Sequence, residues 1–239
     1  MRFLPLCLLL AVIWSCPAQA QDLSIDLGDQ TSLGTRSIQL IALITVLSLV
    51  PGLAVMVTCF PFIVTVLSIL RQAIGLQQAP PNMLIVSLAL FLSWFVMDPV
   101  LTEAWERGAG PLSRGEIGLS EAIPLTLAPF RSFMAARLDS DTFASMQALR
   151  PAAEGAAIDA PLSLLVPSFL LSEIQRAFEI GFLVFLPFLI IDLVVAAILM
   201  SMGMMMVPPA IVSLPFKLAF FVVADGWSLL SAALVRSYF

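Results

Sequence analysis

Apolar residues gather in four long blocks along the chain, with polar stretches between them. The first block runs for 34 residues, 37–70, without one charged residue. At ~1.5 Å per residue, a helix of this length spans about 50 Å, which exceeds the roughly 30 Å hydrocarbon core of a bilayer. Pro51-Gly52 and Pro61 are the places where such a helix would bend or break.

The three later blocks are less uniform. The second covers only 15 residues, 83–97, before Asp98-Pro99, and this is short for a membrane span. The third rises from Pro161 and is densest over 180–202, and the fourth covers 210–235. Four apolar blocks of this kind predict an all-α membrane protein.

The N-terminus has the pattern of a cleaved signal peptide over residues 1–20. Arg2 precedes an apolar stretch, and Ala18-Gln19-Ala20 supplies the small-x-small ending that signal peptidase accepts. An uncleaved first helix is the alternative, but the stretch is short and ends in this cleavage pattern. Residues 21–36 then form a short polar segment, which the signal peptide places in the periplasm.

Residues 102–160 form a polar region with eight acidic residues and five arginines. We expect a separate, mostly helical region whose charged side chains are solvated and whose core contains Phe130, Phe133 and Phe143. Because the mature chain starts outside and two crossings return it there, this region is predicted to be extracytoplasmic, in the periplasm. The hairpin tips at 71–82 and 200–209 would then point inward.

The two apolar halves share an internal repeat. Gly75 is followed by four residues and then Pro80-Pro81, and Gly203 is followed by four residues and then Pro208-Pro209. Glycine permits the backbone angles that end a helix, and two prolines prevent the helix from continuing. We therefore predict two helical hairpins with rigid tips, over 37–101 and 161–239. Both start outside, so the repeat is parallel rather than inverted.

Composition argues against several functional classes. The chain is 60% hydrophobic and 11% charged, against roughly a quarter charged in ordinary soluble domains. Its net charge of -5 provides no basic field for nucleic acid. The chain has no histidine, and its three cysteines form no cluster, so we expect no metal site. Without a glycine-rich phosphate loop or a nucleophile elbow, we expect neither a cofactor nor an enzyme.

Five methionines occupy seven positions at the second hairpin tip, in the order Met200-Ser201-Met202-Gly203-Met204-Met205-Met206. Methionine is unbranched and polarizable, so a cluster can repack around different shapes while staying apolar. In a ring of identical subunits such tips would form a deformable apolar constriction, which stops ions by dewetting. The alternative is a turn that contacts only lipid or a neighbouring subunit.

Charged residues inside the apolar blocks are the second functional signal. Six of them lie in the second hairpin: Glu173, Arg176, Glu179, Asp192, Lys217 and Asp225. The first three are spaced three apart, so they share one side of a helix. Such groups are costly in a membrane and face protein or water. They form either a proton or ion relay or ion pairs that are buried or link subunits, and the mismatched block lengths favour the second.

Several stretches resemble the FliP family, the membrane component of the export gate in the bacterial flagellar type III secretion apparatus. The stretches are Ser172-Glu173, Ala177-Phe178-Glu179-Ile180-Gly181-Phe182, Pro187-Phe188-Leu189-Ile190-Ile191-Asp192-Leu193-Val194, Gly203-Met204-Met205-Met206-Val207-Pro208-Pro209, Leu214-Pro215-Phe216-Lys217, Asp225-Gly226-Trp227, Leu70-Arg71-Gln72-Ala73 and Gln78-Ala79-Pro80-Pro81-Asn82. The resemblance covers most of residues 38–235 and is weaker in the polar region.

The resemblance implies a gate subunit that assembles with copies of itself, FliQ and FliR around a channel for unfolded proteins. It also implies association with FlhA, FlhB and FliO, and a place in the inner membrane at the flagellar basal body. In that family the triple methionine, here Met204 to Met206, forms a gasket that seals the channel. The family's assembly is raised largely out of the membrane plane, and this suits helices of mismatched length.

One departure and three alternatives remain at this stage. Many family members carry a polar segment with an arginine where this chain has Cys59-Phe60-Pro61-Phe62, so that positive charge has no counterpart here. Gate proteins of virulence injectisomes share the C-terminal signature, but the signal peptide and the periplasmic region favour the flagellar branch. A proton-coupled or small-solute transporter would use Asp192 and the Glu173 group. A pure scaffold would need neither those charges nor the methionines.

Overall fold

A computed structural model describes residues 33–76, 79–150, 155–204 and 206–239. The chain divides into two units, 1–45 and 46–239. The described part of the first unit is helical and belongs to α2 (Leu33–Met56), which continues into the second. Every regular element among the described residues is a helix, so the all-α prediction is confirmed. The predicted signal peptide, 1–20, and residues 21–32 of the polar segment lie outside the described residues.

The long first apolar block is broken near Pro61. The helix α2 passes through Pro51-Gly52 and ends at Met56, and α3 (Phe60–Ile74) begins with Pro61 in its first turn. Proline is well suited to that position because the N–H it lacks would have no helical partner there. Of the two break points expected from the sequence, the chain uses the second.

The second apolar block is longer than the sequence indicated. Helix α4 (Asn82–Ala104) continues through Asp98-Pro99 and leads into the π-helix η1 (Trp105–Ala109) and the short α5 (Gly110–Ser113). The stretch 82–113 is 32 residues long and apolar enough to cross a membrane. The expectation of a block too short for a span was therefore wrong. Tertiary packing outweighs the cost of one proline, because Val96, Met97 and Ala104 around it are buried.

The polar region packs onto the apolar helices. It contains α6 (Leu119–Arg137), α7 (Ser140–Ala148) and the 3-10 turn η2 (Ala157–Asp159). Phe130 and Phe133 of α6 pack against the main core cluster, and Phe133 also packs against a smaller cluster of Met134, Leu165 and Phe169, so the region shares its core with α8 instead of having a separate one. Phe143 is half-buried and belongs to neither cluster. At Gly108 the backbone of η1 approaches α6 so closely that an added Cβ would lie 2.6 Å from the backbone nitrogen of Thr126.

The C-terminal half consists of one very long helix and a bent return. Helix α8 (Leu162–Ser201) has 40 residues and contains Pro167 and Pro187. The return comprises α9 (Pro209–Val223) and α10 (Gly226–Arg236), which are bent by 61° relative to each other. Among the described residues three helices are long and apolar enough to cross a membrane, or four if the bent pair is one span.

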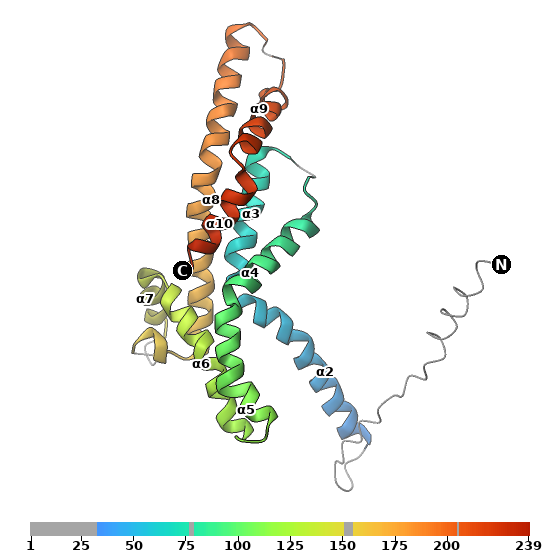
Figure 1. Ribbon diagram of the computed structural model, residues 1–239, viewed down its shortest axis with the longest axis vertical. Helices are drawn as coiled ribbons and strands as arrows, with labels where there is room; N and C mark the ends of the chain where they lie inside the picture. Colours follow the sequence, from blue (N-terminus) through green and yellow to red (C-terminus); the bar gives the residue numbers. More distant parts are fainter. Residues whose placement is uncertain (1–32, 77–78, 151–154, 205) are drawn as a thin grey trace, which may run out of the picture. The chain divides into compact units, whose positions relative to one another are not determined.

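Helix α3 forms the centre of the core of the 46–239 unit. It is flanked by α8 and α4, and its fully buried side chains include Phe62, Ile63, Val66, Leu67 and Leu70. Within this unit the α3–α4 tip and the α8–α9 tip lie toward the same end, and α5 lies at the other (Figure 1). This is the arrangement expected for a parallel repeat of two hairpins.

Candidate functional site: the methionine tip and two buried ionic clusters

The second hairpin tip, residues 200–209, begins where α8 ends, and we call it the methionine tip. Gly203 has a φ of 75°, a left-handed conformation that suits glycine. The N–H of Gly203 donates to the Met200 carbonyl at 3.1 Å, and the N–H of Met204 donates to the Leu199 carbonyl at 3.0 Å, so backbone hydrogen bonds close the end of the helix. Pro208 then caps α9, and Pro209 is its first residue. The loop is therefore anchored to a helix end on each side.

The methionine side chains at this tip project away from the chain's own core. Met206 is 98% exposed, Met202 is 65% exposed, and Met204 is 38% exposed; Met205 lies outside the described residues. Exposed apolar side chains at one point of a protein mark an interaction site. The tip can therefore present several thioethers to another apolar surface.

The tip between α3 and α4 repeats part of this design. Gly75 has a φ of 88°, and its N–H donates to the Gln72 carbonyl. Pro80 and Pro81 follow, and Pro81 caps α4. The two repeats differ further along the chain, because Asp98 lies inside the continuous α4 whereas Asp225 lies at the α9–α10 bend.

The first ionic cluster brings α8, α9 and α3 together at Lys217. Its Nζ lies 2.6 Å from Oδ2 of Asp192 and donates to the Ala73 carbonyl at 3.1 Å. The Ser213 hydroxyl donates to Oδ1 of the same aspartate at 2.5 Å. The Lys217 side chain is only 7% exposed, whereas that of Asp192 is 38% exposed. Ala73 lies in the last turn of α3, where helix carbonyls lack helical donors and carry partial negative charge.

The second ionic cluster surrounds Glu173, which is fully buried. Arg137 Nε lies 3.1 Å from one carboxylate oxygen, and the Tyr238 hydroxyl donates to the other. The Arg137 guanidinium also lies 4.0 Å from the centre of the Tyr238 ring and donates to the Ser237 carbonyl at 2.8 Å. A carboxylate, a guanidinium and an aromatic ring thus join α6, α8 and the residues after α10.

The sequence reasoning missed Arg137 and Tyr238. Arg137 was assigned to a solvated surface, but its side chain is only 13% exposed, so that assignment was wrong. One signal was available, because Phe133 precedes Arg137 by four residues and therefore lies on the same face of α6. Burial raises the pKa of Tyr238, and the adjacent Glu173 carboxylate raises it further.

The remaining predicted charges are placed differently. Arg176 lies 4.0 Å from Glu173, at the limit of an ion pair. Glu179 is exposed and accepts a hydrogen bond from Gln175 at 3.3 Å. Asp225 caps α10 with a φ of 48°, a left-handed conformation uncommon outside glycine. The structure thus groups Glu173 with Arg176 and Asp192 with Lys217. It does not connect the six residues into one continuous relay.

Two carboxylates of the polar region have lowered pKa values. The backbone N–H and hydroxyl of Thr142 hold the pKa of Asp139, the N-cap of α7, below its usual value. The paired guanidinium of Arg114 lowers the pKa of Glu116. Glu116 is exposed and Asp139 is half-buried, and no set of three His, Cys, Asp or Glu that could hold a metal occurs among the described residues.

Comparison with known proteins gives the same family as the motifs. Residues 43–234 match the model of the FliP family. This chain belongs to the FliP family. The match includes both glycine and double-proline tips, both ionic clusters apart from Ser237 and Tyr238, and the described methionines. The FliP-family features therefore lie in the segment whose geometry is described above.

Individual relatives are similar over nearly their whole length. A protein of Caulobacter vibrioides is 48% identical over 228 residues, covering 95% of this chain and 86% of the relative. One of Agrobacterium fabrum is 44% identical over 237 residues, covering 96% and 97%. One of Bacillus subtilis is 42% identical over 205 residues, covering 85% and 93%. Each of these relatives is named flagellar biosynthetic protein FliP.

Proposed function

We propose that this FliP-family chain is a subunit of the flagellar type III export gate and that its methionine tip seals the pore. The flagellar names of the relatives support the flagellar branch over the injectisome branch. The observation that carries the sealing role is the exposure of Met202, Met204 and Met206 on a loop fixed at both ends.

The seal rests on the physics of a narrow apolar ring. When several copies bring their tips together around an axis, Met204, Met205 and Met206 from each copy line a constriction without polar groups. Water leaves such a constriction, and ions cannot enter it without losing their hydration shells. Methionine side chains are flexible, so the same ring can yield to an unfolded chain and close again behind it.

The partners and location follow from the same proposal. The gate contains copies of this chain together with FliQ and FliR, and it works with FlhA, FlhB and FliO in the basal body at the inner membrane. The exposed apolar side chains on the outer faces of α4 and α8 support contacts with membrane or partner helices. The predicted signal peptide would place the polar region, 102–160, in the periplasm.

The chain has a passive role in this proposal. It guides unfolded flagellar proteins through the gate and catalyses no reaction. The energy for export then comes from partners that hydrolyse nucleotide or use the proton-motive force. Lys217 and Asp192 act as one structural ion pair, because each has hydrogen-bond partners within the hairpin or at the end of α3.

Replacing Met204, Met205 and Met206 together by alanine tests the seal. Shorter side chains widen the apolar ring, so we expect an ion leak across the inner membrane several-fold above that of the wild type, with export partly retained. The leak is measured with a membrane-potential dye in cells that assemble the gate. Met83→Ala is the matched control, because Met83 is also an exposed methionine, at 80%, but belongs to the first turn of α4 and not to the methionine tip.

The alternatives give different results in the same experiment. A proton-coupled transporter would lose transport without any leak, and a pure scaffold would show neither change. A triple variant that assembles at the wild-type level and holds a normal membrane potential would overturn the sealing role.

A further inference from the structure

Two interruptions of the helical hydrogen bonding, which we call breaks although α8 continues through the first of them, lie at the base of the segment that carries the methionine tip. In α8, Pro187 has no N–H, so the Leu183 carbonyl receives no helical hydrogen bond from it. In the returning arm, Asp225 has left-handed backbone angles, and α9 and α10 are bent by 61°. We call residues 188–224 between these breaks the methionine hairpin; all of them except Met205 are described.

The two breaks lie close together in space, because aromatic side chains next to them are in contact. The Phe188 ring, next to Pro187, is centred 6.3 Å from the Phe221 ring. Phe221 in turn is 5.3 Å from Trp227, which follows Asp225-Gly226. Gly226 fits closely there, because an added Cβ would lie 2.2 Å from the Phe221 ring. An aromatic cluster therefore closes the base of the hairpin and belongs in part to the main core.

Beyond this base, the methionine hairpin is held together mainly by its own two arms. Val195 and Leu199 of α8 are buried, and the Asp192 carboxylate accepts hydrogen bonds from both Ser213 and Lys217 of α9. Most other large apolar side chains of this segment are exposed. The hairpin is thus an internally bonded unit that projects from the core.

One stripe of α9 connects the methionine hairpin to the rest of the fold. Leu214 lies beside the α3–α4 tip, since an added Cβ on Gly75 would be 3.5 Å from its Cδ1. Lys217 donates to the Ala73 carbonyl, and Leu218 packs against the core. Because these residues are spaced three and four apart, they face α3 together. The Lys217–Ala73 bond is the polar contact in this stripe.

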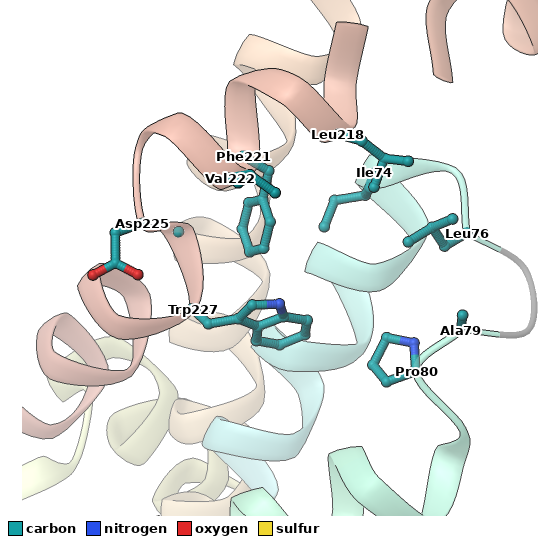
Figure 2. A pocket seen from close by; sticks show the side chains of 10 residues that line it. Ile74, Leu76, Ala79, Pro80, Leu218, Phe221, Val222, Asp225 and Trp227 are labelled. Atoms are coloured by element: carbon teal, nitrogen blue, oxygen red, sulfur yellow. The ribbon is translucent and has the colours of Figure 1, made fainter. Parts of the chain in front are cut away.

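A cavity of about 480 Å³ lies beside these contacts, between the α3–α4 tip and the α9–α10 bend. Its lining includes Ile74, Leu76, Leu218 and Trp227, and the Trp227 ring extends toward Pro80 (Figure 2). The hairpin base is therefore incompletely packed on the side of the α3–α4 tip. The cavity gives the α9 arm of the methionine hairpin space to tilt beside the α3–α4 tip without first displacing packed side chains.

We propose that the methionine hairpin tilts as one body about Pro187 and Asp225-Gly226, and that the Lys217–Ala73 hydrogen bond holds it in the closed position. This inference rests on the proposed sealing function. Tilting carries the methionine tip away from the axis while the Asp192–Lys217 pair stays intact, because both partners lie inside the hairpin. The ammonium therefore separates only from the end of α3, and it can return to the same carbonyl when the gate closes.

Chemical cross-linking in the assembled gate tests this movement. Leu76→Cys with Leu218→Cys joins the α3–α4 tip to the hairpin, since both residues line the cavity in Figure 2. Ile191→Cys with Val212→Cys is the matched control, since these partly buried residues line a cavity of about 540 Å³ between the two arms of the hairpin. Cells are treated with a short bifunctional thiol reagent, and cross-linking is measured by mass. Wild-type cells treated in parallel control for the native cysteines.

The expected result is loss of export with the first pair and wild-type export with the second, at equal cross-linking. The first pair should show no ion leak, because it fixes the hairpin in its sealed position. Continued export through a fully cross-linked first pair would overturn the tilting movement, as would loss of export with the second pair. Failure of the first pair to cross-link would show that the hairpin does not rest on α3. None of these results depends on the leak of the methionine variants, so the seal and the movement fail separately.

Discussion

Glu173→Ala is expected to lower the free energy of unfolding by about 3–5 kcal/mol, the typical cost of removing one partner from a buried ion pair. Glu173 has no exposed surface, and its loss leaves the Tyr238 hydroxyl without this acceptor and the Arg137 guanidinium with only the Ser237 carbonyl. Because α6, α8 and the residues after α10 meet at this carboxylate, we also expect loss of assembled gate and of swimming. The measurement is the thermal unfolding midpoint of the purified chain in detergent, with swimming in soft agar.

Two further variants identify the cause. Glu179→Ala removes an exposed carboxylate from the same helix and should change stability by no more than about 0.5 kcal/mol. Arg137→Met with Glu173→Leu removes both charges and should recover much of the loss, because no buried charge is left unpaired. If Glu179→Ala were as damaging as Glu173→Ala, burial of the charge would not be the reason.

The Asp192–Lys217 pair should respond unequally to the loss of its two members. Asp192→Ala leaves an enclosed ammonium with only the Ala73 carbonyl, and we expect a loss of about 3 kcal/mol. Lys217→Met leaves a carboxylate that is 38% exposed and still bonded to Ser213, so the loss should be about 1 kcal/mol. The same thermal measurement in detergent gives both values.

The functional consequence separates a structural pair from a proton relay. In our account, export by Asp192→Asn falls only as far as the amount of assembled gate falls, which native mass measurement of the extracted complex determines. A relay predicts loss of transport at a normal amount of gate. Equal losses of stability from Asp192→Ala and Lys217→Met would show that the unequal exposure of the two groups has no consequence.

The helices and tips were largely predictable because their signals are local. The glycine and double-proline spacing predicted two turns, and Gly75 and Gly203 both have left-handed backbone angles there. Helix α4 was underestimated because Asp98-Pro99 resembles a helix stop. The burial of Val96 and Met97, which sustains that helix, depends on tertiary contacts and not on local propensity.

The ionic clusters were only partly predictable because they are assembled from distant segments. The six charges inside the second hairpin stand out against apolar neighbours, but their partners do not. Arg137 and Glu173 are 36 residues apart, and Lys217 and Ala73 are 144 residues apart. The backbone carbonyl at the end of α3 has no signature in the sequence, so its bond to Lys217 required the structure.

The position of the methionine side chains in the assembled gate tests the central claim most directly. The measurement is a structure of the complex extracted in mild detergent, at a resolution that shows side chains. The account predicts that Met204, Met205 and Met206 of successive copies line the narrowest part of an axial passage, with their thioethers in mutual contact. Methionine tips dispersed on the outside of the particle, with the passage closed by other residues, would contradict it.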